Sequence, residues 1–400
     1  GTGDFTHPAW LDELDRDLVE DGSGLLSVRP DAAVAWVGEV PEAARREVRF
    51  VISGEVSSIF KKNGRTRKVH SLIFMPSLDA ARRFSIALGR VGNVTSDGRP
   101  ILGLEPLAIF RLVRDICPDS FIIPAHVWTP HFSVFGAMSG FDSLEECFED
   151  MTGEIFAIET GLSSDVPMNR RWSALDRLAL TSSSDAHSPS KLGREATILA
   201  GELSWRGLVS ALKCAGGPGR LLGTVEFFPE EGKYHVDGHR KCGFFCDPSE
   251  TTRLSGRCPV CGGRLTPGVL GRVEQLADRP ADAIPEGFPG QIGLIPLAEI
   301  VAGIQGCGDS SRRVEAHWKS LIARFGGELD ILTGLEPAML DDEHEYAVAE
   351  ALRRMRAGRV FKDPGYDGEY GRIGVFLPGE AARFQGQGLM FGPGERRMPG

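Results

Sequence analysis

The sequence lacks several features that would each place it in a specialised class. It contains no run of about 18 or more apolar residues, so we expect no transmembrane helix and no membrane partner. Basic residues are not in excess, because 45 Lys and Arg stand against 55 Asp and Glu, a formal net charge of −10. A protein that is basic over its whole surface is thereby excluded, whereas a local basic patch is not. The first residues have neither the basic start nor the apolar core of a signal peptide, so none is expected.

The cysteines are few and unevenly spread. Four of the eight lie between positions 242 and 261, and Cys117, Cys147, Cys214 and Cys307 are isolated. A disulfide framework would distribute paired cysteines through the chain, so this pattern instead predicts one metal site in a reducing compartment. We therefore expect a cytoplasmic protein.

The N-terminal part of the chain alternates strand-like and helix-like segments. With 400 residues and 42% hydrophobic residues, the chain is long enough for two or three globular domains. The alternation over residues 1–225 predicts an α/β fold, either a β/α barrel or a doubly wound sheet. Polar residues follow several of the strand-like runs, namely Glu55, His126, Glu159, Asp185 and His187. The carboxyl ends of barrel strands meet at one mouth, where active sites lie.

Carboxylate and imidazole side chains recur at these strand ends in a pattern that predicts a metal site. The candidate ligands are Asp4, Glu55, His70, His126, Asp185 and His187. Oxygen and imidazole nitrogen ligands together suit Zn, Mn or Fe. The Asp185-x-His187 pair taken alone has a second interpretation, since Asp185 could cap a following helix. Several such residues in one α/β domain favour the metal interpretation.

The same residues resemble the later motifs of the PHP (polymerase and histidinol phosphatase) domain over residues 1 to about 200. The matching elements, in order, are Thr2-Gly3-Asp4, Gly54-Glu55, His70, Pro124-Ala125-His126 and Ser184-Asp185-Ala186-His187. The resemblance implies a distorted β/α barrel that holds two or three divalent metals (Zn, Mn or Mg) and hydrolyses phosphoesters. It implies catalytic roles for Glu55, His126 and Asp185. The family's opening His-x-His motif is absent, so we expect a barrel that is truncated at its N-terminus.

The clustered cysteines form a second metal motif, Cys242-x3-Cys246-x11-Cys258-x2-Cys261. Four thiolates in two knuckle-like pairs predict one tetrahedral, structural zinc ion. His235 and His239 could each replace a thiolate, although a surface position or a phosphate contact is our preferred interpretation for both. We expect residues 226–270 to form this zinc ribbon.

The order of segments narrows the resemblance. A PHP barrel (1–225), a zinc ribbon (226–270), a mainly helical DNA-binding region (271–385) and a flexible tail (386–400) resemble the endonuclease Q family. The stretches that carry the resemblance are 227–242, 271–279 and 364–371. The resemblance implies a DNA endonuclease that nicks on the 5′ side of deaminated bases (uracil, hypoxanthine, xanthine) or abasic sites in DNA repair. DNA is then the expected partner, and a sliding clamp is a further candidate.

A basic segment beside Glu55 and His70 is the predicted phosphate contact. It contains Lys61, Lys62, Arg65, Arg67 and Lys68 around an Asn63-Gly64 pair that indicates a hairpin tip. Such a run is often only a solvated loop, but next to a metal mouth on an acidic chain it also suits DNA binding.

Two rival functions stay open at this point. One is a PHP phosphatase that acts on a small phosphate ester, which the zinc ribbon and the basic hairpin disfavour. The other is a catalytically inactive nucleic-acid-binding module or helicase-associated protein. Some bacterial relatives are labelled as helicases, but the sequence has no Gly-x4-Gly-Lys-Ser/Thr loop to hold the phosphates of ATP.

Overall fold

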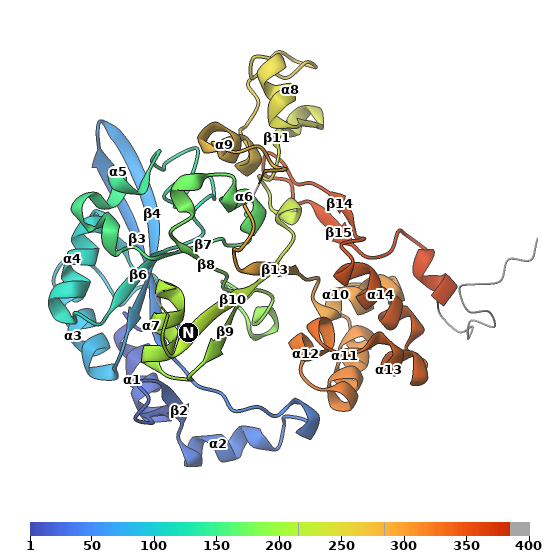
Figure 1. Cartoon of the computed structure of the whole chain (residues 1–400), viewed down its shortest axis with the longest axis horizontal. Helices are drawn as coiled ribbons and strands as arrows, with labels where there is room; N and C mark the ends of the chain where they lie inside the picture. The colour runs from blue at the N-terminus through green and yellow to red at the C-terminus, as the bar shows by residue number, and fades with distance from the viewer. Residues whose placement is uncertain (215, 284, 385–400) are drawn as a thin grey trace, which may run out of the picture. The chain divides into compact units, whose positions relative to one another are not determined.

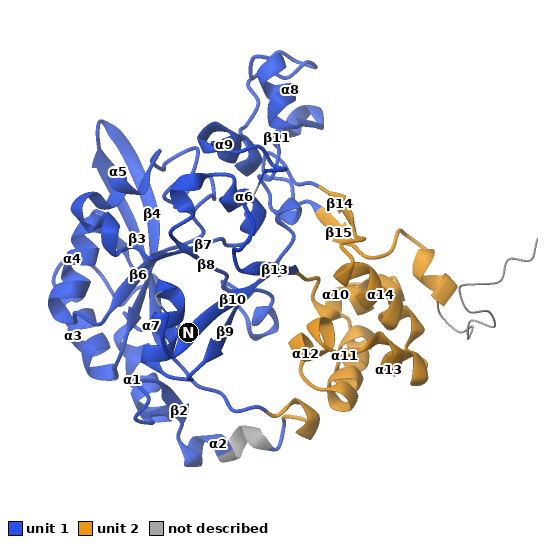
Figure 2. Ribbon diagram, in the orientation of Figure 1, with its two compact units in different colours: residues 1–39, 46–292, 364–371 blue, residues 40–45, 293–363, 372–400 orange. Residues whose placement is uncertain are grey.

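The computed structural model describes residues 1–214, 216–283 and 285–384, without the side chains of residues 34–37. These residues form two compact units (Figure 2). Unit 1 contains residues 1–39, 46–292 and 364–371, and unit 2 contains residues 40–45, 293–363 and the segment from 372 onward. The predicted boundaries at 225 and 270 both fall inside unit 1. The predicted flexible tail, 386–400, lies outside the described residues.

The largest sheet of unit 1 has four strands in the order β5-β3-β4-β6 (Figure 1). Strands β3 (Ile52–Lys62) and β4 (Arg65–Met75) form a long antiparallel hairpin. Its tip is Asn63-Gly64, and both residues have positive φ (53° and 74°), as a tight two-residue turn requires. The predicted hairpin tip is thus confirmed. Strand β5 (Ile101–Leu102) pairs with β3 in parallel, and β6 (Phe121–Pro124) pairs with β4 antiparallel.

The remaining strands of the α/β region continue from β6. Strand β7 (Ala157–Glu159) lies beside β6 and pairs in parallel with β8 (Ala179–Thr181), which lies beside β10. Strand β10 (Gly219–Glu226) pairs antiparallel with β9 (Ala196–Gly201), and β13 (Gly290–Gly293) flanks its other side. A short antiparallel pair, β1 (Leu18–Glu20) and β2 (Leu26–Val28), lies near the start of the chain. The α/β architecture predicted from the sequence is confirmed.

Helices of unit 1 pack on these strands. They are α1 (Pro8–Asp17), α2 (Pro30–Val37), α3 (Leu78–Gly89), α4 (Pro106–Ile116), α5 (Leu144–Phe148), α6 (Val166–Arg170) and α7 (Trp205–Lys213). Several begin at a side-chain cap: the hydroxyl oxygens of Ser77 and Ser204 accept hydrogen bonds from the backbone N–H groups of Ala80 and Gly207. A large apolar core that includes Phe5, Phe84 and Trp128 fixes the strand ends that carry the candidate site.

The cysteine-rich module also belongs to unit 1. Strands β11 (Asp237–His239) and β12 (Phe244–Cys246) form an antiparallel hairpin, followed by α8 (Pro248–Arg253) and α9 (Val269–Leu276). The late segment 364–371 returns to this module. There the backbone N–H of Val236 donates to Gly365 O (3.1 Å), and the ring centroids of Tyr366 and Phe245 are 4.9 Å apart.

Unit 2 is mainly helical. Its helices are α10 (Leu297–Gln305), α11 (Arg312–Phe325), α12 (Glu328–Thr333), α13 (Pro337–Asp342) and α14 (Tyr346–Arg356). They pack around the buried side chains of Val301, Val314 and Leu352. Strands β14 (Phe361–Asp363) and β15 (Arg372–Gly374) form a short antiparallel pair. None of the helices in the described part of the chain combines the length and the hydrophobicity that a membrane crossing requires.

Candidate metal centre

Three neighbouring strands bring Glu55, His70 and His126 together. Glu55 lies on β3, and His70 lies on β4 opposite Ser57, two residues further along β3. His126 follows the end of β6, and the backbone N–H of the preceding Ala125 donates to His70 O (3.2 Å). Strand pairing therefore fixes the spacing of three side chains that are 15 to 71 residues apart in the sequence.

The ligand atoms of this cluster converge on one carboxylate oxygen. Oε1 of Glu55 lies 2.6 Å from Nδ1 of His70 and 3.3 Å from Nε2 of His126, and the two ring nitrogens are 3.1 Å apart. The other carboxylate oxygen, Oε2, accepts a hydrogen bond from the Arg99 guanidinium at 3.1 Å. All three side chains can offer one ligand atom within 4.8 Å of the others. The cluster has the composition of a divalent-metal site.

The electrostatics of the cluster follow from burial and pairing. Burial alone would raise the pKa of Glu55, but hydrogen bonds from His126 and His70 outweigh it and lower that pKa well below its usual value. Burial would likewise lower the pKa of His126, but the hydrogen bond and charge of Glu55 prevail and raise it. For His70 burial dominates, so its pKa is lowered. Glu55 is therefore the fixed negative charge around which the imidazoles are arranged.

Contacts behind the cluster orient His126. The Thr129 hydroxyl lies 3.0 Å from Nδ1 of His126 and itself donates to a backbone carbonyl, that of His131 at 2.9 Å or of His126 at 3.2 Å. A hydroxyl that donates to a carbonyl accepts from Nδ1–H, so Nε2 is left to face Glu55. The backbone N–H of His126 donates to Oε2 of Glu159 at 2.8 Å. The Thr129 contact orients the imidazole, and the Glu159 contact holds the backbone that carries it.

Backbone conformation at the mouth is unusual. Asp4, His126, Phe132 and Asp185 all have positive φ, at 48°, 30°, 60° and 44°. Non-glycine residues adopt such values at a cost, and they gather at sites where a side chain must be presented in one direction. Gly161 (φ 62°) lies so close to His126 that a Cβ atom added to Gly161 would be only 2.4 Å from the Cβ atom of His126. The loops that carry the predicted ligands are thus shaped around this point.

The other predicted ligands lie around the cluster rather than inside it. Asp185 lines a pocket of about 240 Å³ together with His70, His126 and Glu159. Asp4 packs against Gly98, and its pKa is raised by burial and by the charges of Asp97 and Glu55. His187 is exposed, with 76% of its side chain accessible, and its Nδ1 lies 2.9 Å from Asp185 O. Asp185 is therefore closest to the pocket, and His187 lies at the outer edge.

The thiol cluster differs from the predicted one by one ligand. The group with ligand atoms within 4.8 Å of one another is His239, Cys242, Cys258 and Cys261. Cys261 Sγ lies 3.6 Å from Nδ1 of His239, whereas Cys246 Sγ contacts the Thr251 hydroxyl at 3.3 Å. The cause is the hairpin register, which pairs Cys246 with Asp237, two residues before His239 on β11. The two knuckles are therefore His239-x2-Cys242 and Cys258-x2-Cys261.

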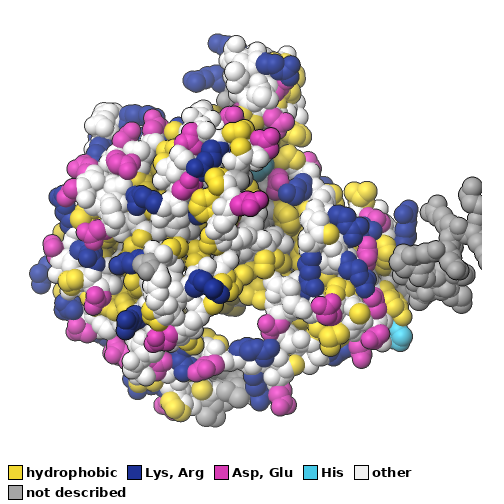
Figure 3. Space-filling model, in the orientation of Figure 1, with side chains coloured by type: hydrophobic (Ala, Val, Ile, Leu, Met, Phe, Trp, Pro, Cys, Tyr) yellow, Lys and Arg dark blue, Asp and Glu magenta, His cyan; other side chains and the backbone are white. Residues whose placement is uncertain are grey.

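The basic hairpin is only partly available to a ligand. Lys61 and Arg65 are exposed, and the Lys68 ammonium lies 5.1 Å from the centroid of the Phe132 ring. Lys62 is instead paired with Glu105 (2.9 Å) and Glu149 (2.6 Å). On the face of the molecule that Figure 3 shows, cationic and anionic side chains are interspersed rather than segregated. The exposed cations of the hairpin are fewer than the sequence suggests.

Arg67 is a structural residue. Only 5% of it is accessible, it donates to the Gly140 carbonyl, and its guanidinium lies 4.3 Å from the centroid of the Phe141 ring. Segment 139–141 folds over it, and that contact cannot be seen in the local sequence. The Arg-rich end of α14 behaves similarly, because Arg356 donates to the carbonyls of Ile331, Leu332 and Leu335.

Three residues next to the centre were not predicted as site residues. Thr129 and Arg99 lie in loops and carry no recognisable motif, so only their contacts reveal them. Glu159 does end a strand, the signal that also marked His126, and it is 4% accessible. Burial raises the pKa of Glu159 to about 7.

Of the aromatic residues near the mouth, Trp128 and Phe135 are fully buried core residues, whereas Phe132 lines the pocket.

Solved structures with a similar architecture are known. The chain is similar to the crystal structure of the lesion-specific endonuclease PfuEndoQ from Pyrococcus furiosus, with a TM-score of 0.79 and 29% identity over 96% of this chain and 88% of that one. It is also similar to endonuclease Q in complex with a 27-mer duplex that carries an abasic lesion at the active site (TM-score 0.78, 29% identity, 95% of this chain and 88% of that one). The chain therefore has the α/β architecture of a lesion-specific endonuclease.

Sequence relatives agree with this assignment. Residues 296–359 match the family model of the MJ0043 C-terminal domain. The uncharacterized protein MJ0043 of Methanocaldococcus jannaschii is 32% identical over 62% of this chain, which spans only 31% of that protein's length. The uncharacterized protein YqxK of Bacillus subtilis is 29% identical over 76% of this chain and 73% of its own length. The chain is thus similar to endonuclease Q in structure along nearly its whole length, and to two uncharacterized proteins in sequence.

Proposed function

We propose that the protein is a metal-dependent DNA endonuclease of lesion repair whose active site is the cluster of Glu55, His70 and His126. The observation that carries the proposal is the convergence of both imidazoles on one carboxylate oxygen, at 2.6 and 3.3 Å, at the mouth of a pocket. Support comes from the similarity to endonuclease Q along nearly the whole chain.

The residues fit a divalent cation. Glu55, His70 and His126 would hold it, and Asp185, Asp4 and His187 are the proposed further ligands for a second or third ion. The Thr129 contact leaves Nε2 of His126 directed at the cluster, which is the donor arrangement of a metal-binding imidazole. When bound, Zn, Mn or Mg ions would neutralise the phosphodiester and lower the pKa of an attacking water.

The protein's own groups position the reaction. A water oxygen forms a bond to phosphorus and gives up a proton, the P–O bond to the leaving strand breaks, and the leaving oxygen takes up a proton from solvent. We assign Asp185 to accept the proton that the water gives up, because its half-exposed carboxylate lines the same pocket as both imidazoles. Arg99 holds the Glu55 carboxylate from behind. Glu55, His126 and Asp185 thereby keep the catalytic roles expected from the sequence.

The pocket sets the proposed substrate. A cavity of about 240 Å³ beside the cluster is bounded by Phe132 and Gly161, and a damaged nucleotide turned out of the helix would enter it. We propose cleavage on the 5′ side of uracil, hypoxanthine, xanthine or an abasic site. The neighbour solved with an abasic duplex supports DNA as the partner. Lys61, Arg65 and Lys68 are the proposed phosphate contacts of the hairpin, and a sliding clamp stays a candidate second partner.

The thiol cluster is proposed to hold one structural zinc ion through His239, Cys242, Cys258 and Cys261. Three thiolates and one imidazole form a closed tetrahedral set. The backbone N–H of Gly263 points at Cys261 Sγ (3.4 Å), as expected for a metal-bound thiolate that accepts hydrogen bonds. All eight cysteines are free thiols, which supports a reducing cytoplasm as the proposed compartment.

The test is an incision assay on labelled duplexes that carry deoxyuridine, deoxyinosine or an abasic site, with an undamaged duplex as reference, in Mn²⁺ or Mg²⁺. The proposal predicts a single nick 5′ of the lesion that is abolished by EDTA and reduced at least a hundredfold in His126→Ala and Asp185→Asn. Arg90→Ala, which removes an exposed side chain at the end of α3, is the control and keeps full activity. Hydrolysis of aryl phosphates without any nicking would instead support a small-molecule phosphatase.

A further inference from the structure

A second, larger cavity lies at the other end of the same strands. It has a volume of about 960 Å³ and is lined mainly by residues of α4, α7 and the segments that lead into β6 and β7. Phe121 begins β6 and Phe156 directly precedes β7, whereas His126 and Glu159 lie at the opposite ends of these strands. None of its lining residues belongs to the pocket beside the metal cluster. The cavity is thus separate from the proposed active site.

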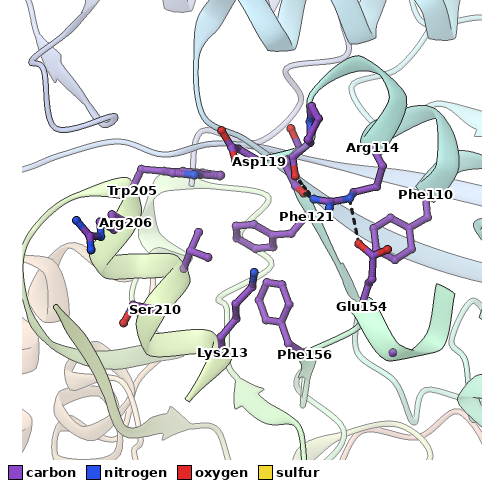
Figure 4. Close-up of a pocket in the computed structure, with 14 residues that line it drawn as sticks. Phe110, Arg114, Asp119, Phe121, Glu154, Phe156, Trp205, Arg206, Ser210 and Lys213 are labelled. Atoms are coloured by element: carbon purple, nitrogen blue, oxygen red, sulfur yellow. Dashed lines mark hydrogen bonds and ion pairs between the residues drawn. The ribbon is translucent and has the colours of Figure 1, made fainter. Parts of the chain in front are cut away.

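Three aromatic rings form one wall of this cavity (Figure 4). The centroid of Phe121 is 5.2 Å from that of Phe156 and 5.4 Å from that of Trp205. Phe121 is almost fully buried, but Phe156 and Trp205 are partly accessible. Accessible aromatic surfaces in a concave site favour a planar ring as ligand, because offset ring contacts add to the burial of apolar area.

The charges of the cavity are divided between its two sides. Helix α7 contributes Arg206 and Lys213, and across the part of the chain that the structure describes no carboxylate pairs with either. The Lys213 ammonium points into the space beside the rings, 5.3 Å from the centroid of Phe156 (Figure 4). On the opposite side Arg114 is neutralised by Glu154 (3.0 Å), and the Asp119 carboxylate is exposed. An anion is favoured at α7, and a hydrogen-bond donor at Asp119.

We propose that this cavity binds a nucleotide. The base would stack against Trp205, its N–H groups would donate to Asp119, and its phosphate would contact Lys213, whose ammonium lies over the Phe156 ring. A volume of about 960 Å³ is at the upper end of the ~300–1,000 Å³ typical of ligand pockets and accommodates a mononucleotide. The same chemistry could come from a free mononucleotide or from the terminal nucleotide of a DNA strand.

The experiment is isothermal titration of the full chain with deoxyadenosine monophosphate, deoxyadenosine, inorganic phosphate and a four-nucleotide deoxyadenosine oligomer, all in EDTA. The monophosphate should bind at least tenfold more tightly than deoxyadenosine or phosphate alone, because only it reaches both sides of the cavity. Lys213→Glu and Trp205→Leu should each weaken binding tenfold or more. Arg90→Glu reverses an exposed charge outside the cavity and serves as the matched control, with unchanged affinity. Thermal melts verify that each variant is folded.

A further variant separates this cavity from the active site. Binding of deoxyadenosine monophosphate should persist in His126→Ala, because that residue belongs to the other pocket. If only the oligomer binds, and Lys213→Glu weakens its binding tenfold or more, the natural ligand of the cavity is the terminal nucleotide of a DNA strand. The proposal is overturned if neither probe binds at millimolar concentration, if Lys213→Glu binds like the control, or if His126→Ala abolishes binding. This inference does not depend on the proposed endonuclease activity, so a negative result in the lesion-incision assay would leave it unaffected.

Discussion

The hydroxyl of Thr129 lies 3.0 Å from Nδ1 of His126 and fixes which nitrogen of that ring faces Glu55. A contact of this kind outside the ligand set orients the ligand and raises its basicity. We predict that Thr129→Ala weakens Mn²⁺ binding by about 10–100-fold, measured by isothermal titration. Thr129→Ser retains the hydroxyl and should bind Mn²⁺ like the natural protein. Equal affinity for all three proteins would show that Thr129 does not orient His126.

Zinc content can distinguish a site completed by His239 from a site completed by Cys246. If His239 completes the tetrahedron, His239→Ala should lose most of the bound zinc, because only three ligands remain. Cys246→Ala should retain one zinc ion per chain, since Cys246 Sγ contacts Thr251 instead. Zinc content is measured by inductively coupled plasma mass spectrometry on purified protein. The reverse pattern would restore the four-cysteine site expected from the sequence.

The two kinds of cation in the β3–β4 hairpin should respond differently to substitution. Arg67→Ala should lower the free energy of unfolding by about 2 kcal/mol, because it removes a buried hydrogen bond and the contact with Phe141. Lys61→Ala and Arg65→Ala should leave stability unchanged but weaken DNA binding, each reducing the slope of log affinity against log salt by about 1. Urea denaturation and fluorescence anisotropy measure the two effects. An Arg67→Ala protein with the same free energy of unfolding as the natural protein would contradict the structural role of Arg67.

How much of the site could be predicted is clear from this hairpin and from the ribbon. The structure brings the predicted residues Glu55, His70 and His126 together, but only His126 follows a strand end, whereas Glu55 and His70 lie within the antiparallel β3–β4 hairpin and are aligned by its register. The burial of Arg67 and the pairing of Lys62 could not be predicted, because a run of cations does not reveal which of them segment 139–141 or Glu149 will cover. The sequence predicts Cys246 as the fourth ligand where the structure places His239, because spacing alone does not fix the register of β11 against β12. Thr129 and Arg99 depend on loop conformations that no local pattern encodes.

A group of buried carboxyls behind the site makes stability depend on pH. Burial, with the charge of Glu195, raises the pKa of Glu226 from 4.5 to about 9, and its side chain accepts a hydrogen bond from Thr160. The folded protein therefore keeps a proton that the unfolded chain loses above its lower pKa. The resulting stability is full below the unfolded pKa and is lost as the pH rises through the folded pKa.

Glu226→Gln tests this directly, because the amide imitates the protonated acid at every pH. We predict little change in the melting temperature at pH 5 and a clear increase over the natural protein at pH 8, on the order of 3 kcal/mol in free energy. Differential scanning calorimetry at the two pH values measures it. A variant that is destabilised equally at both would mean that Glu226 is ionised in the folded state.

The most direct test of the central claim is anomalous diffraction from a crystal soaked in Mn²⁺ and measured above the manganese absorption edge. We expect an anomalous peak within about 2.0–2.3 Å of Oε1 of Glu55 and of a ring nitrogen of both His70 and His126. That peak should be absent from a crystal of Glu55→Gln. If the protein cuts a deoxyuridine duplex but its Mn²⁺-soaked crystals show no metal at these three side chains, then Glu55, His70 and His126 do not form the catalytic metal site.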